Sequence, residues 1–268
     1  MRRELVAALA LTLTLAACGG AGTTTPSISV THSSSTPSSA SASSSTASGT
    51  ATSAVSASRA HGPLPSNGTS FVYVPLWPFA SVAAAEQWQR EANPGGHQPW
   101  HLDAGQIAVM FASQYLNFTE INRVVRQTVT ASDAHVTVGY GAGGTTGTAA
   151  VIHLVRIGSG AARPWEVVGT DDTATFSLTE PPYGSRVAGT IAVGGHIAGV
   201  DESIRVTARQ LHGVVGGYCC LPAGASAPWS VPLRLTGTQP GPVTIVASTG
   251  GHLAVVERFT VTGVRSGQ

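Results

Sequence analysis

The hydrophobic and polar positions of this 268-residue chain follow three patterns in succession. Residues 5–17 are almost wholly apolar, and residues 19–66 consist mainly of Ser, Thr, Ala, Gly and Pro. Residues 71–268 carry apolar side chains at the regular spacings of helices and then of strands. Such periodic spacing is the main sequence signal of packed secondary structure, and the first two patterns lack it. The patterns therefore predict that the folded part of the protein begins near Phe71.

Helices are predicted in the first part of the folded region. Ser81 can cap a helix over residues 82–92, which the following Asn-Pro-Gly-Gly ends. Asp103 can cap a second helix, whose largely apolar stripe at i, i+3, i+4, i+7 and i+8 consists of Ile107, Met110, Phe111, Gln114 and Tyr115. A short helical turn is expected over residues 120–125.

A period of two then replaces the helical pattern. Val136 and Val138 form the first alternating pair, and further apolar segments follow at residues 150–156 and 165–169. Helices followed by hairpin-linked strands predict an α+β domain over residues 67–172, with the helices on a small antiparallel sheet. This order of elements is similar to that of cystatin-like and NTF2-like folds.

Residues 173–268 have the character of strands and turns alone. Alternating apolar positions recur in short segments separated by Gly/Pro clusters, and the segments contain Phe176/Leu178, Ile191/Val193, Ile204/Val206, Val231/Leu233, Val243/Ile245 and Phe259/Val261. Six or seven such strands in about 90 residues predict a two-sheet antiparallel β-sandwich.

The N-terminus carries the features of a membrane anchor. Arg2 and Arg3 precede the apolar run 5–17, which ends in Leu-Ala-Ala before Cys18. A run of about 13 residues fits a signal peptide and is too short for a spanning helix. The segment resembles the lipobox of bacterial lipoproteins, which implies cleavage after residue 17 and lipidation, including palmitate, on Cys18. The alternative is an ordinary secretory signal with a chance cysteine.

Residues 18–66 are expected to be a disordered linker. Their composition leaves too little apolar surface to offset the entropy cost of ordering the chain. A flexible chain of about 48 residues has a reach of roughly 40 Å, enough to hold the folded part away from a membrane. The expected location is therefore the extracytoplasmic face of the cell membrane.

Several motifs in the last 90 residues carry a family resemblance. They are Pro-Pro-Tyr-Gly-Ser-Arg-Val at 181–187, Ile-Ala-Val-Gly-Gly at 191–195, Pro-Trp-Ser-Val-Pro-Leu at 228–233 and Gly-Pro-Val-Thr-Ile-Val-Ala at 241–247. Together they resemble the immunoglobulin-like domain of bacterial spore germination (Gmad2). The resemblance implies an immunoglobulin-like sandwich over residues 173–268 and brings no catalytic residue. No GerMN domain, the usual companion in that family, is recognisable, so the resemblance does not imply a role in germination.

Beyond Cys18, the sequence holds two adjacent cysteines, Cys219 and Cys220. An extracytoplasmic location permits disulfides. Three states remain open for this pair: two free, partly buried thiols in a loop, a vicinal disulfide, or a bond to another chain. The spacing fits neither a C-x-x-C redox motif nor a zinc motif.

The sequence predicts no catalytic residue, no metal site and no cofactor. His97 and His101 are separated by a proline and lack an acidic companion, so they do not form a helical metal motif. His153 lies in an apolar strand and is interpreted as a core or cleft histidine satisfied by backbone groups. The G-x-S-x-G nucleophile motif is absent.

These observations predict a non-catalytic binding module of the cell envelope. A net charge of +1 gives no electrostatic case for nucleic acid, so the expected partners are the membrane, through lipid on Cys18, and an envelope protein or glycan. The alternative is a ligand-binding, or less plausibly enzymatic, α+β domain with the sandwich as a spacer. Convergent polar side chains in that domain, such as His153 or Tyr115, would favour the alternative.

Overall fold

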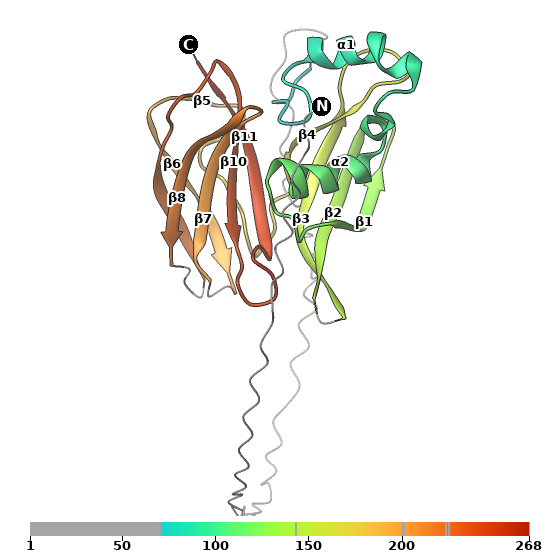
Figure 1. Ribbon diagram of the computed structural model, residues 1–268. Helices are drawn as coiled ribbons and strands as arrows, with labels where there is room; N and C mark the ends of the chain where they lie inside the picture. The colour runs from blue at the N-terminus through green and yellow to red at the C-terminus, as the bar shows by residue number, and fades with distance from the viewer. Residues whose placement is uncertain (1–70, 143, 200–201, 223, 225, 268) are drawn as a thin grey trace, which may run out of the picture. The chain divides into compact units, whose positions relative to one another are not determined.

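The computed structural model describes residues 71–142, 144–199, 202–222, 224 and 226–267. This part of the chain is mostly β-structure with few helices, and it belongs to one compact unit (Figure 1). A strand-rich fold built from several antiparallel sheets is thereby confirmed. The signal peptide, Cys18 and the linker to residue 66 lie outside the described residues.

The predicted helix starts are confirmed, because each depends on a local capping group. Helix α1 (Val82–Glu91) begins after Ser81, whose Oγ accepts the N–H of Ala84 at 3.2 Å. Helix α2 (Ala104–Met110) begins after Asp103, whose Oδ1 accepts the N–H of Gln106 at 3.0 Å. Three short helical pieces complete the set: η1 (Asn93–Gly95), η2 (Pro99–Leu102) and the π-helical η3 (Phe111–Tyr115).

The first sheet has the order β1-β2-β3-β4, with every neighbouring pair antiparallel. Its strands are β1 (Arg123–Val129), β2 (Asp133–Ala142), β3 (Thr145–Arg156) and β4 (Trp165–Thr170). The helical turn expected over residues 120–125 is wrong, since residues from Arg123 onward pair with β2. Pairing across the sheet and the β-branched valines outweigh a weak local preference for helix.

The remaining strands form a five-stranded sheet, β5-β11-β10-β7-β8, and a two-stranded sheet, β6-β9. The strands are β5 (Arg186–Val187), β6 (Thr190–Ala198), β7 (Ile204–Gln210), β8 (Gly213–Leu221), β9 (Ser226–Arg234), β10 (Gly241–Thr249) and β11 (Arg258–Ser266). Apolar residues from both sheets, including Val193, Leu233, Val206 and Ile245, form one hydrophobic core. Alternate residues of β6, β7, β9 and β10 supply most of that core, as the period of two requires.

A second core joins the first sheet and its helices to β10 and β11. Phe111 of η3, Leu154 of β3 and Val261 of β11 belong to the same buried cluster. At its edge the Tyr115 hydroxyl lies 3.1 Å from Thr244 Oγ1. Residues before and after position 172 therefore pack against each other through both apolar and hydrogen-bonded contacts.

Glu166 is a fully buried carboxylic acid on β4. Its Oε2 accepts the N–H of Phe79 at 3.1 Å, whereas its Oε1 has no hydrogen-bond partner in the described part of the chain. Burial raises the pKa of Glu166 well above its ordinary value, and the backbone N–H groups of Phe79 and Trp77 offset that effect only in part. The folded protein therefore holds this proton more tightly than the unfolded chain does.

We expect the buried Glu166 carboxyl group to make the wild type less stable as the pH rises. A raised folded-state pKa stabilises the folded state below the ordinary value of 4.5, and this stabilisation is lost between that pH and the folded-state pKa, at up to about 1.4 kcal/mol per pH unit. Glu166→Gln keeps the shape of the side chain and removes its titratable proton. Urea unfolding from pH 5 to pH 8 should show a flatter dependence in this variant. Parallel curves for the two proteins would contradict the assignment.

Candidate metal centre

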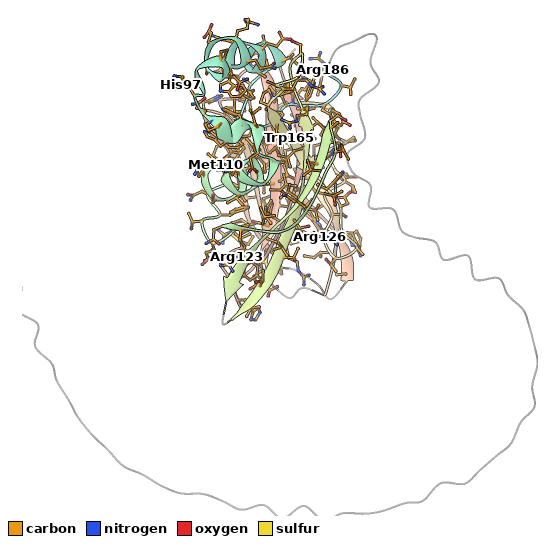
Figure 2. The ribbon with its side chains drawn as sticks, turned by 90° about the vertical axis from the view of Figure 1, so that its right-hand side faces the viewer. His97, Met110, Arg123, Arg126, Trp165 and Arg186 are labelled. Atoms are coloured by element: carbon orange, nitrogen blue, oxygen red, sulfur yellow. A yellow bond between two sulfur atoms is a disulfide. The ribbon has the colours of Figure 1, made fainter. Side chains whose placement is uncertain are left out.

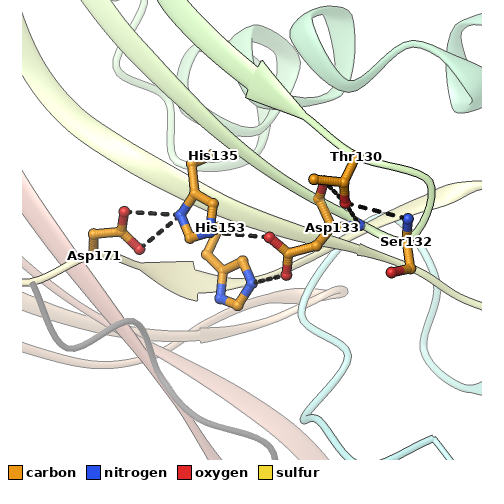
Figure 3. A network of polar contacts seen from close by, with 6 residues as sticks. All are labelled: Thr130, Ser132, Asp133, His135, His153 and Asp171. Atoms are coloured by element: carbon orange, nitrogen blue, oxygen red, sulfur yellow. Dashed lines mark hydrogen bonds and ion pairs between the residues drawn. The ribbon is translucent and has the colours of Figure 1, made fainter.

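Strand pairing brings Asp133, His135 and His153 to one face of the first sheet. His135 on β2 is directly opposite His153 on β3, and Asp133 lies two residues before His135 on the same strand. Residues two apart on a strand point to the same face, so the three side chains converge (Figure 3). Asp171, the residue after β4, approaches from the far side of His135.

The turn between β1 and β2 positions Asp133. Its backbone N–H donates to Thr130 Oγ1 at 3.0 Å, and its carbonyl oxygen accepts the N–H of Thr130 at 2.8 Å. Ser132 N–H also donates to the Thr130 hydroxyl (Figure 3). These local bonds hold Asp133 at the first position of β2, with its carboxylate beside the two imidazoles.

The Asp133 carboxylate bridges the two histidines. Its Oδ1 lies 3.0 Å from His135 Nε2, and its Oδ2 lies 2.7 Å from His153 Nε2. The rings are stacked, with centroids 4.7 Å apart and planes 7° from parallel. One ligand atom from each of these three residues lies within 4.8 Å of the others, which is a spacing that a single metal ion can bridge.

Asp171 holds the other nitrogen of His135. Its two carboxylate oxygens lie 2.8 and 3.1 Å from His135 Nδ1, and its own N–H donates to the carbonyl of Val151 at 2.9 Å. Metal-binding histidines commonly donate their second N–H to a carboxylate, which fixes the ring and leaves the other nitrogen free for the ion. The Asp171–His135 pair has this arrangement.

The charges of the cluster favour a bound cation. Both nitrogens of His135 face carboxylate oxygens, yet a neutral imidazole carries only one N–H. A second proton on the ring, or a metal ion between His135 Nε2 and Asp133, is needed to make both contacts attractive. Two carboxylates, those of Asp133 and Asp171, face the imidazoles, so a bound divalent ion would meet negative charge.

The cluster is closed on one side and open on the other. The His153 side chain is only 3% exposed, whereas those of Asp133 and His135 are 34% and 31% exposed. The Tyr73 ring meets His153 edge-on at 5.7 Å, and burial, together with the Asp133 charge, raises the pKa of Tyr73. An ion could therefore enter from the side of Asp133 and His135.

Two imidazoles and one carboxylate form a donor set typical of divalent transition metals such as Zn²⁺. Three protein ligands leave at least one position for water or another ligand. His153 Nδ1 is buried and has no hydrogen-bond partner among the described residues, so the described chain supports the His135 ring more firmly than the His153 ring.

The structure places the sequence-predicted candidates in different regions. His153 is buried in a strand as expected, but its Nε2 bonds the carboxylate of Asp133 instead of a backbone group. The Tyr115 hydroxyl bonds Thr244 within the second core. His101 packs between Phe79, Trp88 and Trp100, and burial lowers its pKa to about 4.

Cys219 and Cys220 lie on β8, an edge strand far along the chain from the cluster. Their sulfur atoms are joined as a vicinal disulfide in the structure. Cys219 is exposed and Cys220 half-buried, so the pair forms no part of either hydrophobic core.

Asp133 and His135 were not recognised as site residues from the sequence, and Asp171 was interpreted as a hinge or turn residue in preference to a calcium ligand. The available signal was the Asp-x-His spacing at 133–135, which puts both side chains on one face of a strand. A histidine in the next strand of the hairpin could then complete the set. Only the register shows that His153, and no neighbouring residue, lies opposite His135.

In the described part of the chain, no helix is both long and apolar enough to cross a membrane. Comparison with protein families, with characterised proteins and with solved structures gives no match for this chain.

Proposed function

We propose that this protein is a lipid-anchored, extracytoplasmic and non-catalytic binding protein that holds a divalent transition-metal ion. The ligands are Asp133, His135 and His153, and Asp171 orients His135. The observation that carries this proposal is the convergence of the three donor groups within 4.8 Å, with a carboxylate behind one imidazole. This assigns a ligand to the binding module that the sequence predicts.

The donor types favour zinc and its neighbours over calcium or magnesium. Ca²⁺ takes six to eight oxygen ligands and Mg²⁺ keeps several waters, whereas imidazole nitrogen suits Zn²⁺, Ni²⁺ and Cu²⁺. Donor atoms bound at about 2.0–2.2 Å in a tetrahedron stand roughly 3.3–3.6 Å apart. The contacts of Asp133 Oδ2 with His153 at 2.7 Å and of Asp133 Oδ1 with His135 at 3.0 Å would therefore open by about 0.3–0.9 Å around an ion.

A purely structural role for the Asp–His contacts is the competing explanation. Partly exposed ion pairs of this kind contribute only about 0–1 kcal/mol to stability. In that explanation a second proton on the His135 ring, instead of an ion, makes both carboxylate contacts attractive. Metal titration separates the two explanations.

The experiment is a titration of the metal-free full chain with Zn²⁺, followed by calorimetry and by competition with a chromophoric chelator. We expect one ion per chain, and we expect Co²⁺ to show the visible absorption of a four- or five-coordinate nitrogen/oxygen site. Ca²⁺ and Mg²⁺ should not compete. The proposal fails if Zn²⁺ binds no more tightly than about 1 mM, which corresponds to about −4 kcal/mol.

Asp171→Asn tests the role of the supporting carboxylate. Losing such a partner lowers metal affinity by roughly 10- to 100-fold because the ring is less well oriented and less basic. The stoichiometry of one ion should persist, since the three ligands remain. Glu91→Gln, which removes one negative charge from an exposed position on helix α1, serves as the matched control and should bind as the wild type does. Equal losses in the two variants would point to net charge instead of orientation.

The proposal also covers the division of the folded part into two domains. We assign residues 67–172 to an α+β domain and residues 173–268 to a Gmad2-like, immunoglobulin-like sandwich. In support, the helices among the described residues all precede position 172, and a separate hydrophobic core draws its members from residues 176–264. The lipid on Cys18 would attach the chain to the membrane, with residues 18–66 as the linker.

A further inference from the structure

Strand β1 is an exposed sheet edge. It is the terminal strand of its sheet, with β2 as its one strand neighbour among the described residues. All seven of its residues are exposed, and Val124, Val125 and Val129 are 39%, 41% and 47% exposed. An edge strand presents backbone N–H and C=O groups that an added strand can pair with.

A groove runs between this edge and helix α2. It has a volume of about 510 Å³, and its apolar residues are Val109 and Met110 of α2 and Val124 of β1. Gly105 lets the helix lie close to the strand, because a Cβ there would stand 3.3 Å from the Val124 side chain and 3.1 Å from Gln127 Oε1. In Figure 2 Met110 lies on the helix, and Arg123 and Arg126 lie on the neighbouring strand.

The two faces of β1 differ in chemistry. Val124 and Gln127 pair with Val138 and Val136, whose side chains belong to the core beneath α2. Arg126 pairs with Thr137, on the opposite face that also carries His135. A strand added to β1 would therefore place alternate side chains beside the apolar groove and beside the arginines.

The positive charge of β1 favours some added strands over others. The strand carries Arg123 and Arg126 and no acidic residue. Pairing with β1 of a second copy would bring like charges together, which is destabilising across strands. Acidic side chains on the arginine face of an added strand would be attracted instead.

We propose that β1 and α2 form a docking site for an extended segment of a partner protein in which apolar residues alternate with acidic residues. Main-chain pairing with β1 supplies affinity, the groove takes the apolar side chains, and the arginines select acidic ones. The bulge between Val124 and Arg126 interrupts the regular ladder, so pairing is expected chiefly along residues 126–129. Thr128 of β1 pairs with His135, so this site borders the proposed metal ligands, but none of its contacts uses them.

The test uses the full chain and two synthetic nine-residue peptides, one alternating valine with glutamate and one alternating valine with lysine. Binding is measured by fluorescence anisotropy, and protection of the β1 amides is measured by hydrogen exchange. We expect the glutamate peptide to bind and to protect residues 126–129. Arg126→Glu should weaken its binding roughly tenfold and improve binding of the lysine peptide. Arg234→Glu, an exposed arginine on β9, is the matched control and should leave both affinities unchanged.

Because Arg126 is exposed, the variant is expected to fold, and its circular dichroism spectrum should match that of the wild type. Reversal of peptide preference in Arg126→Glu alone supports the proposal. The proposal is overturned if neither peptide binds the wild type. It is also overturned if Arg126→Glu and Arg234→Glu change the affinities equally. A wild-type dimer that Arg126→Glu dissociates or strengthens would identify a second copy as the occupant and would also overturn it.

Discussion

Replacing His153 with alanine is expected to lower the affinity of the full chain for Zn²⁺ by at least about a hundredfold. Even the loss of a supporting partner behind a ligand costs roughly 10- to 100-fold, and this substitution removes a ligand itself. With Asp133 and His135 alone, the site would hold the ion through two side chains. Competition against a chromophoric chelator at fixed pH measures the change, because protons compete with the metal for imidazole.

His153 is nearly fully buried, so its removal also leaves a cavity that can destabilise the protein. His135→Ala is therefore the companion variant, since that side chain is 31% exposed and its loss disturbs the core less. His212→Ala removes an exposed histidine elsewhere and should leave Zn²⁺ affinity unchanged. If all three variants bind Zn²⁺ as tightly as the wild type, the metal centre is located elsewhere or does not exist.

Replacing Cys18 with alanine is expected to move the protein almost completely from the membrane fraction to the soluble fraction. A lipidated cysteine contributes about 0.8 kcal/mol for each CH₂ group buried in the bilayer, and two or more acyl chains hold a protein durably. Alanine offers no thiol for that modification. The measurement is metabolic labelling with an alkyne analogue of palmitate, combined with fractionation of the cells.

The remaining cysteines provide the control for this experiment. The double substitution Cys219→Ala and Cys220→Ala leaves Cys18 in place and should retain both the label and the membrane location. Label that persists in Cys18→Ala would show that the anchor is not at this cysteine. Release of the protein by the control variant would implicate the pair on β8 instead.

Features that depend on neighbouring residues could be predicted from the sequence. The caps at Ser81 and Asp103 act on N–H groups three residues away, so the helix starts follow from local composition. The period of two in the strands after position 173 likewise reflects alternation of side chains within each strand. The strand-rich class of the fold is a sum of such local signals.

Features that depend on pairing between strands required the tertiary structure. Residues 123–129 became strand β1 because β2 pairs with them, although their local pattern indicated a helical turn. The metal cluster needs the register that places His135 opposite His153 and the approach of Asp171 from beyond β4.

A shift of one residue in that register would turn His153 to the other face of the sheet. The sequence by itself thus determined the helix starts and the strand-rich class, since local chemistry suffices for each. The tertiary structure alone decided which polar residues meet, because the register of β2 and β3 follows from their pairing and its bulge, and the side-chain pattern of either strand alone does not encode it.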